Sequence, residues 1–237
     1  MHKLSYNALA TSYGVKLKDN QKIKMNKTQS YDRIAFGYDF IAGLFSFNQI
    51  NKSQLAFVSH LSTQATCLIL GGGTGYFLQK LLEENKTIHV TYVDASMKMI
   101  ASAQKRISKK RPSELYRVSF ICKHVEDFQF ENYDLIVCNY FLDLFDDAYV
   151  TLLIERFKQH LKKDGLLYIT DFSIPEKGFM HWSTKVGVKI LYTLFGWITS
   201  LSVQHLPNIK SIVLQNNFVL LESVAFFKGA LKCNLYK

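Results

Sequence analysis

The segment that most constrains this chain is CLILGGGTGYFLQKLL, residues 67–82, where an apolar run meets alternating glycines and then an amphipathic helical pattern. This order predicts a strand, a tight turn and the N-terminus of a helix. Gly71, Gly73 and Gly75 can adopt backbone angles closed to other residues, and they leave room for a ligand against bare main chain. The helix start offers unpaired N–H groups to a polar or anionic ligand. The spacing is G-x-G-x-G rather than the dinucleotide motif G-x-G-x-x-G, and close packing alone is the alternative interpretation.

A second strand is predicted about twenty residues later, in HVTYVDASMKMI, with Asp94 at its C-terminal end. In a doubly wound sheet, ligands bind outside the carboxyl ends of the strands, where an acidic side chain can accept both hydroxyls of a ribose. The alternative role of Asp94 is to cap a helix that begins near Ser96, and both roles can hold together. A glycine loop followed by an acid at the end of the next strand predicts a nucleoside-binding crevice.

The remaining pattern predicts a doubly wound α/β fold with a mainly parallel, seven-stranded, Rossmann-like sheet. Predicted strands lie near 66–70, 88–93, 117–122, 133–138 and 165–171. Helical crossovers lie near 75–85, 96–110 and 147–162, two helices are predicted within 30–60, and another near 205–216. The last segment, FVLLESVAFFKGALKCNLYK, predicts an antiparallel hairpin around Lys228 and Gly229.

Four segments of the chain resemble the class I S-adenosylmethionine-dependent methyltransferases, most closely the small-molecule branch that includes the menaquinone and ubiquinone methylases. These segments are LGGGTGYF at 70–77, VDASMKMIASAQKR at 93–106, YDLIVCNYFLDLF at 133–145 and LKKDGLLYITDF at 161–172. The resemblance covers most of residues 30–237. It implies S-adenosyl-L-methionine as the cofactor. By the same resemblance, residues 70–77 are the cofactor loop and residues 93–106 are the ribose segment with its helix. Residues 133–145 are the fourth strand with its active-site tip, and residues 161–172 are the helix, turn and strand that end at the fifth tip.

The resemblance also implies a set of cofactor-binding residues. They are Gly71, Gly72, Gly73, Gly75, Asp94, Ala95, Met97, His124, Val125 and Asn139. Two positions depart from the family pattern. Ile69 replaces an acid, so the cofactor's ammonium is expected on main-chain carbonyls at Gly71 and near Asn139. His124 stands where the family has an acid facing the adenine amine; a neutral His nitrogen can accept that hydrogen bond, and a surface position at a strand end is the alternative.

Methyl transfer from a sulfonium requires alignment of the acceptor and exclusion of water, and it needs a base only when the acceptor must lose a proton. The resemblance places Asp143, Asp171 and His181 at or after the tips of strands four and five. Tyr38 and Tyr140 are expected as polar liners of the site. Asp143 is the first candidate for the base and Asp171 the second. The structural alternatives are a helix cap for Asp143, a lid contact for Asp171 and a solvated loop position for His181.

The net charge of +10 lies entirely outside the predicted cofactor core. Residues 61–173 hold 14 Lys and Arg against 14 Asp and Glu, whereas residues 1–60 hold 8 against 3 and residues 174–237 hold 7 against 2. In the family these flanks form the lid over the substrate, which implies an electropositive mouth and an anionic partner: a small molecule, a phospholipid surface or nucleic acid. Solubility is the alternative explanation of the charge.

Residues 182–203, WSTKVGVKILYTLFGWITSLSV, are apolar on almost every side. Glycines and hydroxyl residues dilute the run, so a membrane span is not predicted. The segment is predicted to be either a packed helix or an apolar lid that lines the acceptor site or touches a membrane surface.

The composition predicts one globular domain. The chain has 237 residues with 48% hydrophobic content and no visible repeat. Its expected parts are a helical N-terminal lid region (1–60), the cofactor-binding core (61–173), a lid insertion (174–204) and a last helix with hairpin (205–237). The N-terminus MHKLSYNALA lacks a secretion signal, and the four cysteines fall in apolar runs without metal-ligand spacing, so a cytoplasmic enzyme without a metal is expected.

The predicted function is therefore methyl transfer by in-line displacement to a small, anionic or amphipathic acceptor. An aminopropyl-type transferase on the same fold is one alternative, although a basic mouth would repel its cationic acceptor. An RNA-directed methyltransferase, or a binding protein that has lost catalysis, is another. The segment after the fourth strand lacks the prolines typical of enzymes that methylate exocyclic base amines, but methylation of RNA ribose or ring carbons stays open. The oligomeric state also stays open.

Overall fold

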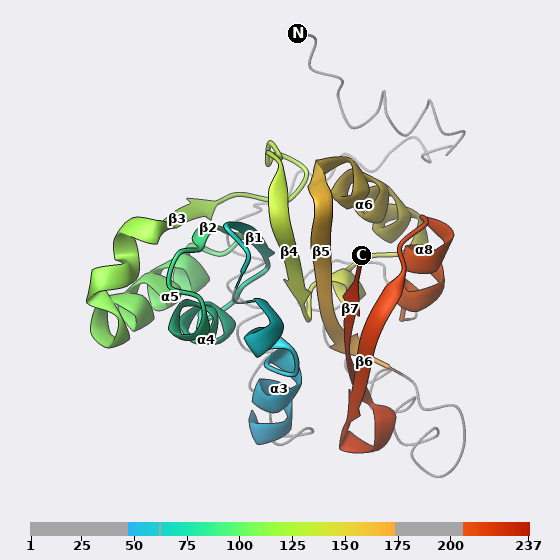
Figure 1. The fold of residues 1–237 in the computed structure, drawn as a ribbon, viewed down its shortest axis with the longest axis horizontal. Coiled ribbons are helices and arrows are strands. Elements are labelled where there is room, and N and C mark those ends of the chain that lie inside the picture. Colours follow the sequence, from blue (N-terminus) through green and yellow to red (C-terminus); the bar gives the residue numbers. More distant parts are fainter. Residues whose placement is uncertain (1–46, 62, 174–205) are drawn as a thin grey trace, which may run out of the picture.

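A computed structural model describes residues 47–61, 63–173 and 206–237, and its centre is one seven-stranded sheet (Figure 1). The order of the strands is β3-β2-β1-β4-β5-β7-β6. Strands β1 to β5 are parallel, and β7 is antiparallel to both β5 and β6. The strands are β1 (Thr66–Leu70), β2 (His89–Asp94), β3 (Val118–Cys122), β4 (Tyr133–Asn139), β5 (Leu161–Phe172), β6 (Leu220–Phe226) and β7 (Leu231–Tyr236). The predicted doubly wound sheet with a C-terminal antiparallel hairpin is thus confirmed.

Helices cover both faces of the sheet. They are α3 (Phe47–Gln54), α4 (Tyr76–Glu84), α5 (Met97–Lys110), α6 (Asp147–His160) and α8 (Ile209–Gln215), with short 3-10 turns η1 (Val58–Leu61), η2 (Pro112–Arg117), η3 (Leu142–Leu144) and η4 (Phe227–Gly229). Alternate residues of β1 enter two different hydrophobic clusters: Ile69 packs with residues of α4 and α5, and Leu70 packs with residues of α6 and α8. This alternation is the period of two expected for a strand buried on both faces.

Side-chain caps explain where two of the helices begin. The Ser96 Oγ accepts a hydrogen bond from the Met99 N–H at the start of α5 (3.4 Å), and the Asp146 carboxylate accepts one from the Tyr149 N–H at the start of α6 (2.8 Å). The cap of α5 is therefore Ser96, and the proposal that Asp94 caps this helix is wrong.

The fifth strand is longer than its apolar pattern predicts. It begins at Leu161, where a helical crossover to residue 162 and a turn were expected, because Leu161 already pairs with Tyr133 before the register shifts. Asp164 has a φ of 66°, and a Cβ at Gly165 would lie 2.9 Å from the Lys162 carbonyl oxygen. The polar residues that suggested a turn thus form an irregular start of β5.

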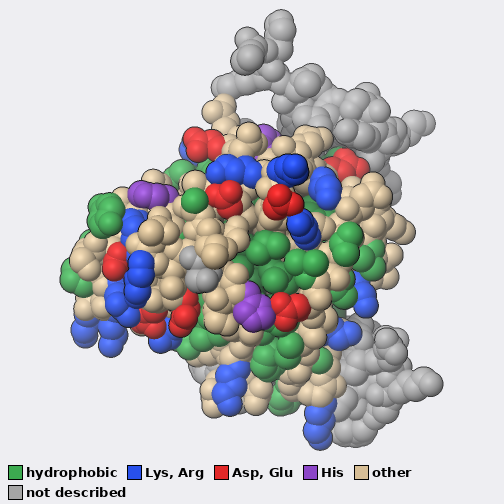
Figure 2. Space-filling view, viewed as in Figure 1, with side chains coloured by type: hydrophobic (Ala, Val, Ile, Leu, Met, Phe, Trp, Pro, Cys, Tyr) green, Lys and Arg blue, Asp and Glu red, His purple; other side chains and the backbone are tan. Residues whose placement is uncertain are grey.

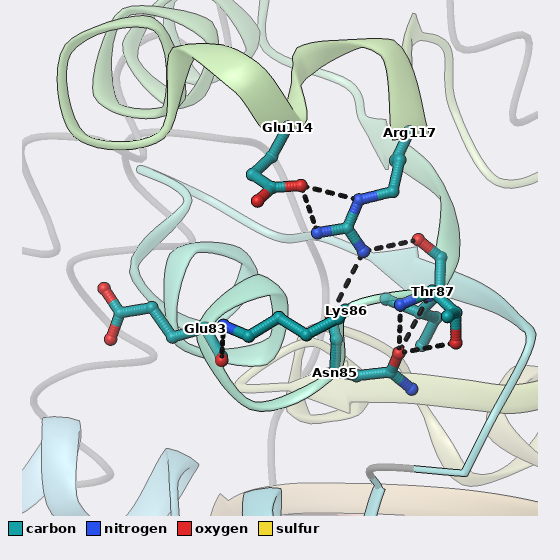
Figure 3. Close-up of polar contacts among 7 residues, drawn as sticks. Glu83, Asn85, Lys86, Thr87, Glu114 and Arg117 are labelled. Atoms are coloured by element: carbon teal, nitrogen blue, oxygen red, sulfur yellow. Dashed lines mark hydrogen bonds and ion pairs between the residues drawn. The ribbon is translucent and has the colours of Figure 1, made fainter.

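A buried arginine joins the end of α4 to η2 (Figure 3). Arg117 is 2% exposed, and its Nη1 donates to the carbonyl oxygens of Asn85 and Ile88, both at 3.1 Å. Its Nε donates to Glu114 Oε2 at 2.8 Å, and the two side chains form an ion pair. Asn85 Oδ1 accepts from the Thr87 and Ile88 N–H groups, which closes the turn before β2. The network thus fixes η2, which precedes β3, against the turn between α4 and β2.

We expect Glu114→Gln to lower the free energy of unfolding by about 1 to 3 kcal/mol, because it removes the charge that compensates a buried guanidinium. Urea unfolding at neutral pH measures this change. Glu84→Gln is the matched control, since Glu84 is exposed and makes no ion pair within the described residues. Equal effects of the two substitutions would contradict a stabilising role for the Glu114 and Arg117 pair.

Several predicted features lie outside the described residues. These are Tyr38, His181, the segment 174–204 that was predicted as a lid insertion, and the part of 1–60 that precedes α3. Within the described ranges, no helix is long and apolar enough to cross a membrane.

Candidate active site

A hollow opens where the parallel strands end, at the edge of the sheet where doubly wound folds bind their ligands. Residues from the ends of β1, β2 and β4 line it, together with Ile50 of α3 and Phe172 of β5. The predicted site residues that it brings together are Gly71, Gly73, Asp94, Ala95, His124, Val125, Tyr140 and Asp143. This is the crevice that the glycine loop and Asp94 predicted.

Gly71 and Gly73 present bare main chain to the hollow. Both have left-handed backbone angles, with φ of 61° and 62°. The Gly73 carbonyl oxygen accepts a hydrogen bond from the Tyr92 hydroxyl (2.9 Å) and its N–H donates to Asp94 Oδ2 (3.0 Å). A Cβ at Gly73 would meet no atom within 4 Å, so this side of the loop is open to a ligand.

The other two glycines serve packing instead. A Cβ at Gly72 would lie 2.3 Å from the Tyr92 ring, and one at Gly75 would lie 2.9 Å from the Ala103 Cβ on α5. Neither glycine lines the hollow. The alternative that part of this motif exists for close packing therefore describes Gly72 and Gly75, and it applies in part to Gly71, where a Cβ would lie 2.5 Å from Phe141 Cδ2.

Met97 also differs from its expected role. Its side chain is 57% exposed, and Met99 lines the hollow in its place. Two residues apart on a helix lie on nearly opposite sides, so both cannot face one pocket. A contact from the Met97 side chain to the cofactor is not supported by this geometry.

Asp94 ties the glycine loop to the start of α5. Its Oδ1 accepts from the Ser96 N–H (2.8 Å) and its Oδ2 from the Gly73 N–H (3.0 Å). Burial raises the pKa of this carboxyl, while both hydrogen bonds oppose that rise. A carboxylate has about four acceptor positions, so two remain for hydroxyl groups in the hollow.

Asp143 and Asp171 form a buried carboxyl pair beside the hollow, each 4% exposed. Asp171 Oδ2 accepts from the Asp143 N–H (3.3 Å), and its Oδ1 accepts from the Phe172 N–H (3.0 Å). Only Asp143 lines the hollow. Asp171 does not line the hollow; it contacts Asp143 through the Asp143 main-chain N–H.

The two carboxyls differ in how they hold a proton. Burial raises the pKa of Asp143 to about 7, and a hydrogen bond from Asp171 opposes that rise. Burial, followed by the negative charge of Asp143, raises the pKa of Asp171 well above its usual range. Two carboxylates in contact do not ionise together, so the first ionisation of the pair leaves one proton shared between Asp143 and Asp171.

Aromatic side chains form the wall on the Asp143 side of the hollow. They are Tyr140, Phe141, Phe145 and Phe172. Tyr140 has a φ of 53°, its hydroxyl lies 2.6 Å from the Ser53 Oγ of α3, and its ring centroid lies 5.0 Å from that of Phe172. This end of the hollow is thus apolar and anchored to the helix that precedes the sheet.

The other end of the hollow holds His124 and Val125 after β3, with Lys123 and Glu126 beside them. The predicted adenine end is therefore placed against the hollow and not on a remote surface. The charged lining in the described chain is Asp94, Glu126, Asp143 and Lys123, so an electropositive mouth would have to come from residues outside it.

Of the positions tied to the cofactor's ammonium, Gly71 lines the hollow, whereas Ile69 and Asn139 lie outside the lining. Ile69 is 1% exposed and packs in the cluster on the α4 side, away from Leu70, which lines the hollow. Asn139 is 7% exposed, and neither its Nδ2 nor its Oδ1 has a hydrogen-bond partner in the described chain. A buried amide of this kind usually meets a partner, so Asn139 is a candidate contact for a polar ligand at the tip of β4.

The fold and the hollow define a Rossmann-like domain with a nucleoside-type crevice that also contains Asp143, one member of the buried carboxyl pair. Residues 68–167 match a family model described as a methyltransferase domain. A malonyl-[acyl-carrier protein] O-methyltransferase of Priestia megaterium is 29% identical over 148 residues, which covers 62% of this chain and 48% of that protein. A ubiquinone/menaquinone biosynthesis C-methyltransferase of Agrobacterium fabrum is 24% identical over 170 residues, 70% of this chain and 65% of that protein.

The structural comparison agrees with these similarities. The mitomycin 7-O-methyltransferase MmcR superposes with a TM-score of 0.67 at 15% identity, over 88% of this chain and 59% of that one. This likeness shows the shared fold. Together the findings identify an S-adenosylmethionine-dependent methyltransferase domain, which the family model matches over residues 68–167. The chain spans about half the length of the first curated relative.

Proposed function

We propose that this protein transfers the methyl group of S-adenosylmethionine to a hydroxyl oxygen or an acidic carbon of a small, largely apolar acceptor. The observation that carries the proposal is that Gly71, Gly73, Asp94 and Asp143 line one and the same hollow. A nucleoside site and a titratable carboxyl thus face the same space. Similar proteins are named as a malonyl-[acyl-carrier protein] O-methyltransferase and a 2-methoxy-6-polyprenyl-1,4-benzoquinol methylase, and these names support an oxygen or a quinol as the acceptor group.

The residues of the crevice fit the cofactor's parts. Asp94 would accept the ribose hydroxyls, Gly73 would lie against the nucleoside, and His124 would accept from the adenine amine. The ammonium would be held by the Gly71 carbonyl and at Asn139, where Ile69 removes the family's acid. When bound, the cofactor supplies an activated methyl group on a sulfonium.

Asp143 would remove the acceptor's proton. Its ionised form, which prevails above a pKa of about 7, can take a proton from a hydroxyl or an acidic carbon held against the aromatic wall. Asp171 would position Asp143 by accepting its main-chain N–H. Phe141, Phe145 and Phe172 would orient a flat apolar acceptor and exclude water.

The basic flanks add a second feature to the acceptor. Most of the excess charge lies in 1–60 and 174–237, chiefly in residues outside the described ranges. If these flanks cover the aromatic end, the acceptor is amphipathic, with an apolar part against the wall and an anionic group toward the flanks. The same basic flanks would also attract an anionic membrane surface.

Calorimetry with S-adenosylmethionine and its demethylated product tests the cofactor site, and both should bind. Mass spectrometry of the purified protein should reveal co-purifying nucleoside and acceptor. A panel of phenols, quinols and acyl thioesters, incubated with cofactor carrying a deuterated methyl, should then show transfer of the labelled group. Absence of nucleoside binding would refute the proposal at its first step.

A further inference from the structure

The cofactor core is neutral in total but strongly polarised along the chain. Residues 95–125 contain eight Lys and Arg against one Glu, whereas residues 126–173 contain four against ten Asp and Glu. The basic segment comprises α5, η2 and β3, and β3 is the outermost strand on that side of the sheet. Figure 2 shows the result as blue side chains gathered at the lower left, over the region of α5 and η2.

The arginines of this segment are occupied by contacts within the domain. Arg106 donates from Nε to the Thr74 carbonyl oxygen (2.9 Å), and Arg111 lies 3.4 Å from Glu83. Arg117 is buried against Glu114. Their charges therefore stabilise the fold and are not the ones left for a partner.

The lysines of α5 are in a different situation. Lys105, Lys109 and Lys110 are exposed, and they form no ion pair or hydrogen bond in the described chain. Lys98 is exposed near the start of the same helix. Residues 98, 105 and 109 are spaced by seven and four, so they lie on one side of the helix. We call Lys98, Lys105, Lys109 and Lys110 the lysine face.

The side chains between these lysines are short. Ala101, Ser102 and Ser108 are exposed on α5, and the helix contains no acidic residue. Its apolar residues Ile100 and Ala103 are buried against the sheet. The ammonium groups of Lys105, Lys109 and Lys110 thus stand among short side chains, and α5 itself carries no carboxylate beside them.

We infer that the lysine face is a docking surface for the acidic side of a helical protein partner. Charge complementarity selects an anionic partner, and a convex set of charges along about 18 Å of helix matches a similar set of Asp and Glu on another helix. Single-stranded RNA is usually bound by basic grooves with several stacking aromatics, and Tyr116 is the one large exposed aromatic of this described segment. A membrane-bound helix needs an outward apolar face, and that of α5 points inward.

The docking surface lies next to the hollow without being part of it. Ser96 and Met99, at the beginning of α5, line the hollow, whereas Lys105, Lys109 and Lys110 do not. A partner on this face would sit beside the nucleoside end of the site. Changes to the three lysines should therefore leave cofactor binding intact.

The probe for this inference is a designed three-helix bundle that carries Asp and Glu along one helix, labelled for fluorescence anisotropy. A bundle with Lys at the same positions is the ligand control. Binding of the acidic bundle should be measurable at about 0.05 M salt and should weaken strongly at about 0.5 M, where charges are screened within a few ångström. The test variant of the full chain combines Lys105→Gln, Lys109→Gln and Lys110→Gln, and we expect about tenfold weaker binding.

A second triple variant controls for net charge. It combines Lys163→Gln, Lys210→Gln and Lys228→Gln, three exposed lysines outside α5, and it should retain binding within about twofold. Thermal unfolding and cofactor binding of both variants verify that the domain is intact. Equal weakening by the two triples would overturn the docking surface. So would tighter, α5-dependent binding of a single-stranded RNA, or of vesicles containing phosphatidylserine, than of the acidic bundle.

Discussion

Replacing Asp143 with Asn should lower turnover by about 10²- to 10⁴-fold while cofactor affinity stays within about threefold. The amide has nearly the same shape as the carboxyl, but it cannot take a proton from an acceptor. Asp143 lines the hollow with the aromatic residues of the wall, and it makes no hydrogen bond to Asp94, whose carboxylate is held by the Gly73 and Ser96 N–H groups. Steady-state kinetics with an identified acceptor and calorimetry with S-adenosylmethionine measure the two quantities separately.

The pH profile tests the same role without relying on one rate. Because burial raises the pKa of Asp143 to about 7, turnover of the unmodified protein should rise with pH through about 7 and then level off. The Asn variant should lack this rise. Asp127→Asn is the matched control, since Asp127 is an exposed carboxyl outside the lining, and it should keep the profile of the unmodified protein. An unchanged profile in Asp143→Asn would assign the proton transfer to another group.

The free energy of unfolding should fall with rising pH, whereas turnover should rise. The folded-state pKa of Asp143 lies above the ordinary carboxyl value, so the folded protein binds the extra proton more tightly. The associated stabilisation is present below pH 4 and is lost as pH rises through about 7. We expect Asp143→Asn to be more stable than the unmodified protein at pH 8, by on the order of 2 kcal/mol. Urea unfolding at pH 5 and pH 8 separates this effect from a general packing change, which would be similar at both values.

Local signals explain why one half of the site could be predicted from the sequence. The turn at Gly71 and Gly73 and the acid at Asp94 belong to strand ends that the apolar pattern marks directly. Parallel strands bring such ends to one edge, so their proximity follows from the topology. The hollow accordingly contains these residues.

The acceptor half depends on distant contacts that no local pattern encodes. Ser53 of α3 anchors Tyr140 of the β4 tip across 87 positions of the chain, and Phe172 enters the wall from the end of β5. A serine and a phenylalanine in these segments have no distinguishing spacing. Only the packing of α3 against the sheet identifies them.

When a family motif is assigned as a whole, residues that bind a ligand are not separated from residues that only pack. Gly72 and Gly75 are as prominent in the sequence as Gly73, yet they make room for Tyr92 and Ala103 and not for a ligand. Met97 and Met99 are equally plausible from the segment alone, and the angle between consecutive helical residues decides that Met99 faces the hollow. Backbone geometry, which the motif does not contain, separates the two roles.

Asp94→Ala should weaken S-adenosylmethionine binding by on the order of 1 to 3 kcal/mol, because two ribose hydroxyls would lose their acceptors. The same carboxylate braces the site by accepting from the Gly73 and Ser96 N–H groups. A loss of affinity could therefore reflect a lost ligand contact or a loosened loop. Calorimetry of the Ala variant alone does not distinguish these causes.

Ser96→Ala provides the distinction. It removes the side-chain cap of α5, which should cost about 1 kcal/mol of stability, but it leaves the Asp94 carboxylate in place. Adenine and adenosine serve as paired ligands, since only adenosine has the ribose hydroxyls. If Asp94 holds the ribose, Asp94→Ala should erase most of the preference for adenosine over adenine, whereas Ser96→Ala should keep it. A preference that survives in Asp94→Ala would assign this carboxylate to bracing the loop and leave the ribose to other groups.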